Sequence, residues 1–263
     1  MPITGTLKTK RIIMDTNYVV SGLNLSESWL TVFDKVTNNT GNELSPLVVT
    51  ITDFSESLAV KRTLDKHLVK NEHYGIDTVA ATIFPDALYH FFKTDRNLLY
   101  ANYINNLPRL KRADPANRRG TYFERLIAYD EIKRVNQLEI IIGSLLDKNN
   151  PRRSKLQAGI FDPLQDHLND KYQKFPCLQH VTFYKSETGG LILNSFYAIQ
   201  YLYQKAYGNW LGLINLGKFV ANEAGLNFER FNCFIGIEQL EAKITKADAK
   251  SLLKDINTAS QLQ

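Results

Sequence analysis

Residues 177–225 constrain the fold most, because they predict two strands, a tight turn and a long helix with no linker between them. The runs CLQHVTFY (177–184) and LILNSFYAIQY (191–201) are rich in β-branched and aromatic residues, which favour strands. The intervening segment SETGG (186–190) predicts a turn that reverses the chain. This part of the chain therefore predicts a β-hairpin followed by a helix.

The helix is expected because apolar and small residues recur along one helical face after the second strand. That face comprises Trp210, Leu213, Ile214, Gly217, Val220, Ala221 and Ala224. Gly225 follows as a natural C-cap, and Gly217 in the middle of the stripe predicts close packing on a sheet.

The rest of the chain predicts further helices and strands around this segment. Helices are expected at 26–38 (opened by Ser26), 54–71, 76–93 and 135–148 (stopped by NNP at 149–151), and strands at 47–52 and 155–161. These elements predict an α+β fold, with a mixed sheet carrying helices on one face. No internal repeat or low-complexity linker is visible, so residues 1–263 are expected to form a single domain.

Composition limits the class of protein. No apolar run reaches the roughly 18 residues that span a bilayer, and the N-terminal MPITGTLKTKR lacks the apolar core of a signal peptide. Two cysteines make no disulfide framework, which favours a reducing cytoplasm. The five histidines form no metal-ligand spacing with either cysteine, so we expect no zinc site. Because no apolar run is long enough to span a bilayer, we also expect no contact with a membrane.

The formal net charge of +5 is moderate, and the densest basic cluster is LPRLKRADPANRRG (107–120). Pro108, Pro115 and Gly120 predict a loop, which is either a solvated turn or an anion-binding loop beside a site. A nucleic-acid binder is a weaker hypothesis, because the basic residues are confined to one loop without interleaved aromatic residues.

Cys177 has two interpretations. Free cysteine is among the most buried residue types, so a packing role is the plain interpretation. A thiol at the start of a strand, directly after Pro176, can instead serve as a nucleophile. Cys233, inside the apolar run FNCFIGI (231–237), is expected to be a buried structural residue.

Several short segments resemble, in order, the thymidylate synthase and pyrimidine hydroxymethylase superfamily. They are TYFERL (121–126), QL (137–138), PRRS (151–154) leading to FDP (161–163), PCLQHVTF (176–183), and AYGNW (206–210) with Asn215. The likeness covers residues from about 120 to 240. It implies a thymidylate-synthase-like mixed sheet, a homodimer, and transfer of a one-carbon group to C5 of a pyrimidine nucleotide. It also implies 5,10-methylenetetrahydrofolate as the one-carbon donor.

The resemblance assigns Cys177 as the thiolate that adds to C6 of the pyrimidine ring. It places Tyr122 and Arg125 near the ligand cleft. It also implies that Arg152 and Arg153 reach across a dimer and bind the phosphate of the partner's nucleotide. The alternative for this pair is a solvated surface turn. Strand alternation puts Gln179 on the face of Cys177, so Gln179 is expected to share the cleft. The carboxamide of Asn215 matches the O4 and N3–H edge of uracil, although the residue can also simply fill a helix face. A cation must lie near the thiol to ionise it, and Arg125 or a partner arginine is expected to provide it.

The chain also departs from the superfamily. LYQK (202–205) stands where an Arg-Ser-x-Asp motif is expected, the Asp-Arg-Thr-Gly loop is absent, and the apolar IGI (235–237) occupies the position of His-x-Tyr. Asp77 is the nearest carboxylate to the expected catalytic glutamate and can equally cap a helix. These losses support a second hypothesis, in which the protein is a catalytically inactive nucleotide-binding or regulatory module.

Overall fold

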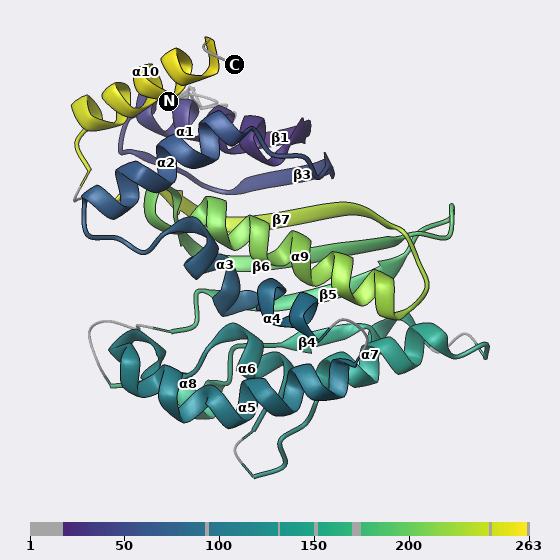
Figure 1. Ribbon diagram of the computed structural model, residues 1–263. Helices are drawn as coiled ribbons and strands as arrows, with labels where there is room; N and C mark the ends of the chain where they lie inside the picture. Colours follow the sequence, from purple (N-terminus) through teal and green to yellow (C-terminus); the bar gives the residue numbers. More distant parts are fainter. Residues whose placement is uncertain are drawn as a thin grey trace, which may run out of the picture.

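The computed structural model describes residues 18–92, 95–130, 132–149, 152–169, 175–241 and 244–261 (Figure 1). A seven-stranded sheet has the order β1-β3-β7-β6-β5-β4, and β2 pairs with β7 beside β3. The strands are β1 (Tyr18–Asn24), β2 (Glu43–Leu44), β3 (Leu47–Asp53), β4 (Gln157–Gly159), β5 (Leu178–Lys185), β6 (Leu191–Tyr201) and β7 (Phe228–Gln239). The β1–β3 and β6–β7 pairs are parallel and the others antiparallel, so the predicted mixed sheet is confirmed.

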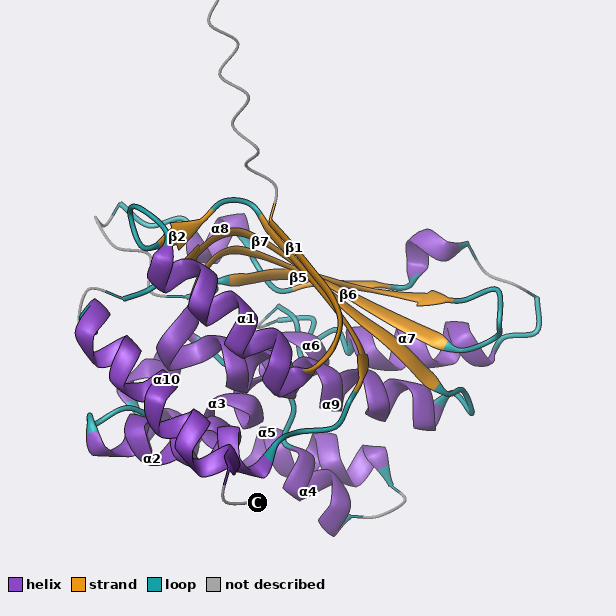
Figure 2. Cartoon of the chain, turned by 90° about the horizontal axis from the view of Figure 1, so that it is seen from above, coloured by secondary structure: helices purple, strands orange, loops and turns teal. Residues whose placement is uncertain are grey.

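The long helices lie on one face of this sheet, as Figure 2 shows, which confirms the predicted α+β arrangement. The helices are α1 (Leu25–Asn38), α2 (Leu58–Lys70), α3 (Ile76–Ile83), α4 (Asp86–Phe91), α5 (Arg96–Ala113), α6 (Tyr122–Ile127), α7 (Gln137–Leu146), α8 (Pro163–Asp166), α9 (Tyr207–Glu223) and α10 (Lys246–Gln261). No helix among the described residues is long and apolar enough to cross a membrane.

Helix α9 is the centre of the helical layer, and its glycines allow unusually close contacts. A Cβ on Gly217 would lie 2.3 Å from the ring of Phe228, which confirms the close packing predicted at this position. A Cβ on Gly212 would lie 2.6 Å from the backbone oxygen of Ala80 in α3. Distances below about 3 Å are steric overlaps, so α3 can rest on α9 only because a glycine is present.

The predicted hairpin is also confirmed. Strand β6 has the bounds that the sequence predicts, and residues 186–190 form the turn between β5 and β6. The predicted helix stop is confirmed by Gly225, which has a φ of +66° just after α9. The stop predicted for α7 at 149–151 lies partly outside the described residues.

Some helix boundaries differ from the predictions. Helix α1 begins one residue before Ser26, because Asn24 is the N-cap and accepts the N–H of Glu27 at 2.9 Å. The hydroxyl of Ser26 instead bonds the Tyr207 hydroxyl at 2.8 Å. Helix α2 begins only at Leu58, since Ser57 is its N-cap. The predicted 76–93 helix is divided into α3 and α4 at Phe84–Pro85.

The predicted loop at 107–120 is wrong for its first half, because Pro108 lies inside α5. A proline removes one helical hydrogen bond, but Leu99, Tyr103 and Leu107 are buried along the same helix and hold it against the core. Asp95 caps the start of α5 by accepting the N–H groups of Asn97 and Leu98. Only residues 114–121 form the connection, which includes a 3₁₀ turn at Pro115–Arg119.

Candidate functional site

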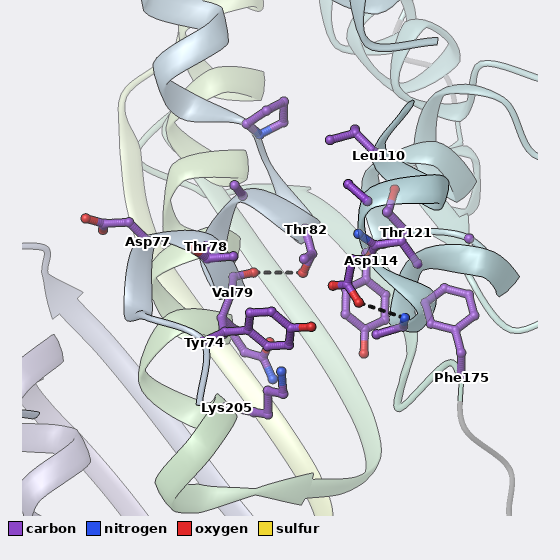
Figure 3. Close-up of a pocket in the computed structure, with 18 of the residues that line it drawn as sticks. Tyr74, Asp77, Thr78, Val79, Thr82, Leu110, Asp114, Thr121, Phe175 and Lys205 are labelled. Carbon is purple, nitrogen blue, oxygen red and sulfur yellow. Dashed lines mark hydrogen bonds between the residues drawn. The ribbon is translucent and has the colours of Figure 1, made fainter. Parts of the chain in front are cut away.

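A cleft of about 920 Å³ opens between α3 and α4 on one side and α5, the Pro115–Arg119 turn and the start of α6 on the other (Figure 3). The ends of β6 and of the segment leading into β5 form its base, together with the turn Leu202–Ala206. Ligand sites in proteins commonly occupy about 300–1,000 Å³. The cleft is therefore large enough for a nucleotide-sized molecule.

Cys177 lies on the wall of this cleft, just before β5, and is partly buried. Burial raises the pKa of its thiol, and the charge of Lys205 acts in the opposite direction. For the Cys177 thiol, desolvation thus opposes ionisation more strongly than the charge of Lys205 favours it. Cys233 has no exposed surface, as predicted, and burial raises the pKa of its thiol as well.

Lys205 is the cation that the sequence analysis missed, since its segment was considered only as the site of a lost motif. It precedes α9, lines the cleft, and places its Nζ 5.0 Å from the ring centroid of Tyr74 (Figure 3). Among the described residues, no carboxylate forms an ion pair with it. Burial lowers the pKa of Lys205, and Asp114, Cys177 and Glu241 partly offset this effect.

Asn209, on the first turn of α9, is the second residue that the sequence analysis missed. It is only 5% exposed and lines the cleft, yet its carboxamide has no hydrogen-bond partner among the described residues. Asn215, the carboxamide predicted for this role, lies about a turn and a half later and does not line the cleft. The sequence signal that distinguishes Asn209 from Asn215 is helical register, because residues six positions apart point to different sides of a helix.

Tyr122 lines the cleft as predicted, at the start of α6. Thr121 fixes the start of this helix through a capping box with Glu124, whose N–H it accepts at 3.1 Å. The ring of Tyr122 packs on Phe175, with centroids 5.2 Å apart. Burial raises the pKa of Tyr122, as does the charge of Cys177 to a lesser degree, so the phenol remains neutral.

Buried polar groups with unused hydrogen-bonding capacity lie at and behind the inner end of the cleft. Gln200 lines the cleft and is 2% exposed; its Oε1 accepts from Trp210 Nε1 at 3.0 Å, and its Nε2 has no partner. Glu238 faces Gln200 across the β6–β7 pair, and neither of its carboxyl oxygens has a partner. The hydroxyl of Tyr197 is likewise unpaired. Burial raises the pKa of Glu238 well above its usual value.

Arg125 is not placed beside Cys177. It is 6% exposed, lines a separate smaller cavity, and donates from Nη2 to Asp166 at 2.9 Å. Its guanidinium lies 5.6 Å from the ring centroid of Phe175, a residue that itself lines the cleft. Lys205, rather than Arg125, is the cation whose charge lowers the pKa of the Cys177 thiol.

Gln179, Arg152 and Arg153 also lie outside the cleft. An irregularity between Leu178 and His180 interrupts strand alternation, and Gln179 turns back to donate to the backbone oxygen of Pro176 at 2.8 Å. Arg152 is exposed, and Arg153 places its guanidinium 4.9 Å from the ring centroid of Tyr184. Neither arginine lines the cleft of its own chain.

The cleft thus combines a thiol, an amine, a free carboxamide and a phenol, supplied by three segments: the residues before β5, the continuous stretch from Leu202 into α9, and the start of α6. Among the described residues, no group of three or more metal-ligating side chains is close enough to hold a metal ion. Comparison with known proteins identifies no matching family model and no matching curated protein.

Cys177 is expected to react with iodoacetamide in the folded protein, whereas Cys233 should react only after unfolding. The reaction should accelerate as the pH rises, because burial raises the pKa of Cys177 and only the thiolate reacts. Lys205→Met should slow it further, since the cation that lowers this pKa is lost. Lys218→Met, on the exposed side of α9, is the matched control. Mass spectrometry of each cysteine peptide gives the rates; equal inertness of both thiols would contradict the position of Cys177 in the cleft.

Proposed function

We propose that this protein is a thymidylate-synthase-like protein that binds a pyrimidine nucleotide in the cleft and transfers a one-carbon group to C5 of its base. The observation that carries this proposal is the joint presence of Cys177, Lys205 and Asn209 on the wall of one nucleotide-sized cleft. Along the chain, the β5–β6 hairpin is followed by α9 and then by β7, and Cys177 directly precedes β5. This order of elements supports the thymidylate-synthase-like form of the fold.

The chemistry follows from the thiol. When Cys177 Sγ forms a bond to C6 of the ring, the electron pair of the C5–C6 double bond moves onto C5 and the neighbouring carbonyl oxygen. Carbon 5 then becomes a nucleophile, which is the purpose of covalent catalysis at such a ring. Lys205 is the cation whose charge lowers the pKa of the Cys177 thiol, so it favours the thiolate. The same positive charge would balance the negative charge of the adduct.

Asn209 is suited to hold the base. A carboxamide offers an N–H donor and an oxygen acceptor side by side, which matches the O4 and N3–H edge of uracil. The residue is only 5% exposed and its amide has no partner among the described residues, so a ligand with this edge would satisfy both groups. We therefore assign to Asn209 the role that the sequence suggested for Asn215.

The outer part of the cleft suits the implied folate. Pro85, Leu88 and Leu110 form an apolar wall for flat rings, and Arg109 provides a cation for carboxylates. When bound there, 5,10-methylenetetrahydrofolate would supply the one-carbon unit. Cys177 and Cys233 are both free thiols, and we place the protein in the cytoplasm on this basis.

A second candidate function is nucleotide binding without catalysis. It is favoured by the raised pKa of Cys177 and by the state of the two carboxylates in the cleft. Asp77 forms an ion pair with Lys61 at 3.1 Å, and Asp114 accepts the backbone N–H of Ala116 at 2.8 Å. Both are thus engaged in structural contacts, which leaves neither as an evident general base.

Mass spectrometry of the intact protein with a 5-fluoropyrimidine nucleotide, with and without folate, tests both functions. A covalent adduct in the parent protein and none in Cys177→Ser would support catalysis, because fluorine does not leave C5 as a proton does. Saturable but non-covalent binding would support the inactive module. If no pyrimidine nucleotide binds at all, the proposed function is wrong.

We also propose a homodimer that forms through the outer sheet face, where Figure 2 shows no long helix over the central strands. Phe196 and Phe234 stack there with centroids 5.3 Å apart and remain 39% and 40% exposed. A hydrogen-bonded row from Thr50 through Asn232 and Asn194 to Thr182 crosses four strands beside them. In such a dimer Arg152 and Arg153 would serve the partner's nucleotide phosphate.

Light scattering at micromolar concentration should therefore give the mass of a dimer. Phe196→Asp/Phe234→Asp should shift the protein towards monomer, because a buried unpaired charge opposes association. Phe91→Asp, on exposed α4, is the matched control, and it should leave the mass unchanged. A stable monomer of the parent protein would contradict the proposed dimer.

A further inference from the structure

A second cavity of about 420 Å³ lies next to the cleft and is not used by the proposed function. The Pro115–Arg119 turn separates the two spaces. Ala116 and Asn117 from this turn line the cleft, whereas Arg118 and Arg119 line the small cavity. One short turn therefore forms part of the wall of both spaces.

The small cavity has an excess of positive charge. Its charged lining residues are the cations Lys111, Arg118, Arg119 and Arg125 and the carboxylates Glu124, Asp130 and Asp166. Two cations are neutralised within the wall, since Lys111 pairs with Glu124 at 2.8 Å and Arg125 pairs with Asp166 at 2.9 Å. The side chains of Arg118 and Arg119 form no hydrogen bond or ion pair with any described residue.

The remaining carboxylate does not neutralise these two arginines. Asp130 uses its Oδ1 to accept the backbone N–H groups of Ile132 and Lys133 at 2.9 and 2.7 Å. It forms no ion pair with a described cation. Asp130 keeps its negative charge, so the two free guanidinium groups leave the lining of the cavity with a net charge of +1.

Arg125 supplies an independent indication of a ligand. Its guanidinium is buried, and its Nη1 has no acceptor. Asp166 does not bond this atom: its Oδ1 accepts from Nη2 instead, and its Oδ2 accepts the backbone N–H of Asp162 at 2.7 Å. A buried donor of a charged group without an acceptor is costly, and an anion in the cavity would supply the acceptor.

We propose that this cavity is a phosphate-binding site formed by Arg118, Arg119 and Arg125. Guanidinium groups bind phosphate through paired N–H donors, and three of them match a group with several acceptor oxygens. The source is either free inorganic phosphate or the phosphate chain of a molecule that extends past the turn from the cleft. This site does not depend on the proposed chemistry at Cys177.

Bound phosphate would also stabilise the wall of the cleft. The turn is already fixed at its start, where Asp114 accepts the N–H of Ala116, and at its end, where Gly120 has a φ of +118°. Neutralising the two adjacent arginines between these points removes their mutual repulsion. Phosphate should therefore favour the conformation of the turn that lines the cleft.

Isothermal titration with inorganic phosphate at low ionic strength tests the site. The parent protein should show saturable binding, and Arg118→Ala/Arg119→Ala should weaken it about tenfold or more, as expected for lost charge-assisted hydrogen bonds. Arg62→Ala/Lys66→Ala on α2 removes the same charge from exposed positions, and it should change the Kd less than about twofold. No saturable binding by the parent, or equal weakening in both variants, would overturn the proposal.

A competition experiment distinguishes the two sources. If phosphate and a pyrimidine nucleoside monophosphate compete, and if Arg118→Ala/Arg119→Ala weakens both, the nucleotide supplies the group. If both bind together, free phosphate is the ligand, and this also supports the site. Because the phosphate titration needs no nucleotide, it can succeed when the proposed function fails, and the two failures remain distinct.

Discussion

Gly212→Ala is expected to lower the free energy of unfolding by about 2 kcal/mol, as is usual for overpacking of a well-packed contact. The added Cβ would lie 2.6 Å from the backbone oxygen of Ala80 and 3.0 Å from Ile83 Cβ. A backbone group cannot rotate away as a flexible side chain can, so α3 must move off α9. Urea unfolding measures the change, and ligand binding should weaken with it because α3 forms one wall of the cleft.

Gly143→Ala is the matched control for this substitution. Gly143 is also inside a helix, α7, but a Cβ there meets nothing within 4 Å. Alanine should therefore stabilise the protein by up to about 1 kcal/mol through its better helix propensity. Equal stabilisation of both variants would contradict the close contact between α3 and α9.

Glu238→Met is expected to stabilise the fold by about 1–3 kcal/mol, which is the range for relieving an unsatisfied buried polar group. Both carboxyl oxygens of Glu238 lack partners, and the side chain has no exposed surface. Methionine has a similar length and no need for hydrogen bonds. Glu187→Met, at an exposed position in the β5–β6 turn, should change stability by less than about 0.5 kcal/mol. A destabilised Glu238→Met variant would show that the carboxyl has a partner after all.

The same carboxyl predicts a pH dependence with a definite sign. Burial raises the pKa of Glu238 above 4.5, so the folded state retains a proton that the unfolded state has already lost. The free energy of unfolding should therefore fall as the pH rises from about 4.5 to the raised pKa, and it should not fall further from this cause above that pKa. Glu241 acts in the same direction, because burial also raises its pKa. Glu238→Gln should reduce the fall measured by urea unfolding across this range; an unchanged profile would contradict a neutral Glu238.

Local features of the fold were predictable from sequence, because short-range chemistry determines them. Strand β6, the turn before it and the end of α9 at Gly225 were read from side-chain type and glycine position alone. The order of strands was not predictable, since pairing between β3 and β7 joins residues such as Leu47 and Ile235. Pro108 misled the prediction because burial of its neighbours in α5 outweighs one missing hydrogen bond.

Sequence predicted correctly only those site residues that lie at the start of a helix or strand bordering the cleft. Cys177 and Tyr122 lie at the starts of elements that border the cleft, and both were expected there. Gln179 was misplaced because one irregular residue in β5 reverses the alternation on which the prediction relied. Lys205 and Asn209 were missed because helical register shows only which residues share a face, whereas the face that meets the cleft depends on how α9 packs.

The position of β7 between β3 and β6 has a consequence for how the chain emerges from the ribosome. β7 is the last strand in the described chain, and the β1–β3 pair joins the β5–β6 hairpin through it. Until residues 228–239 have been synthesised, the two pieces remain separate, and β3 and β6 each expose an unpaired edge. Exposed strand edges invite pairing with other chains. Nascent chains halted between residues 202 and 227 should therefore bind chaperones and aggregate, and release of β7 should end this state.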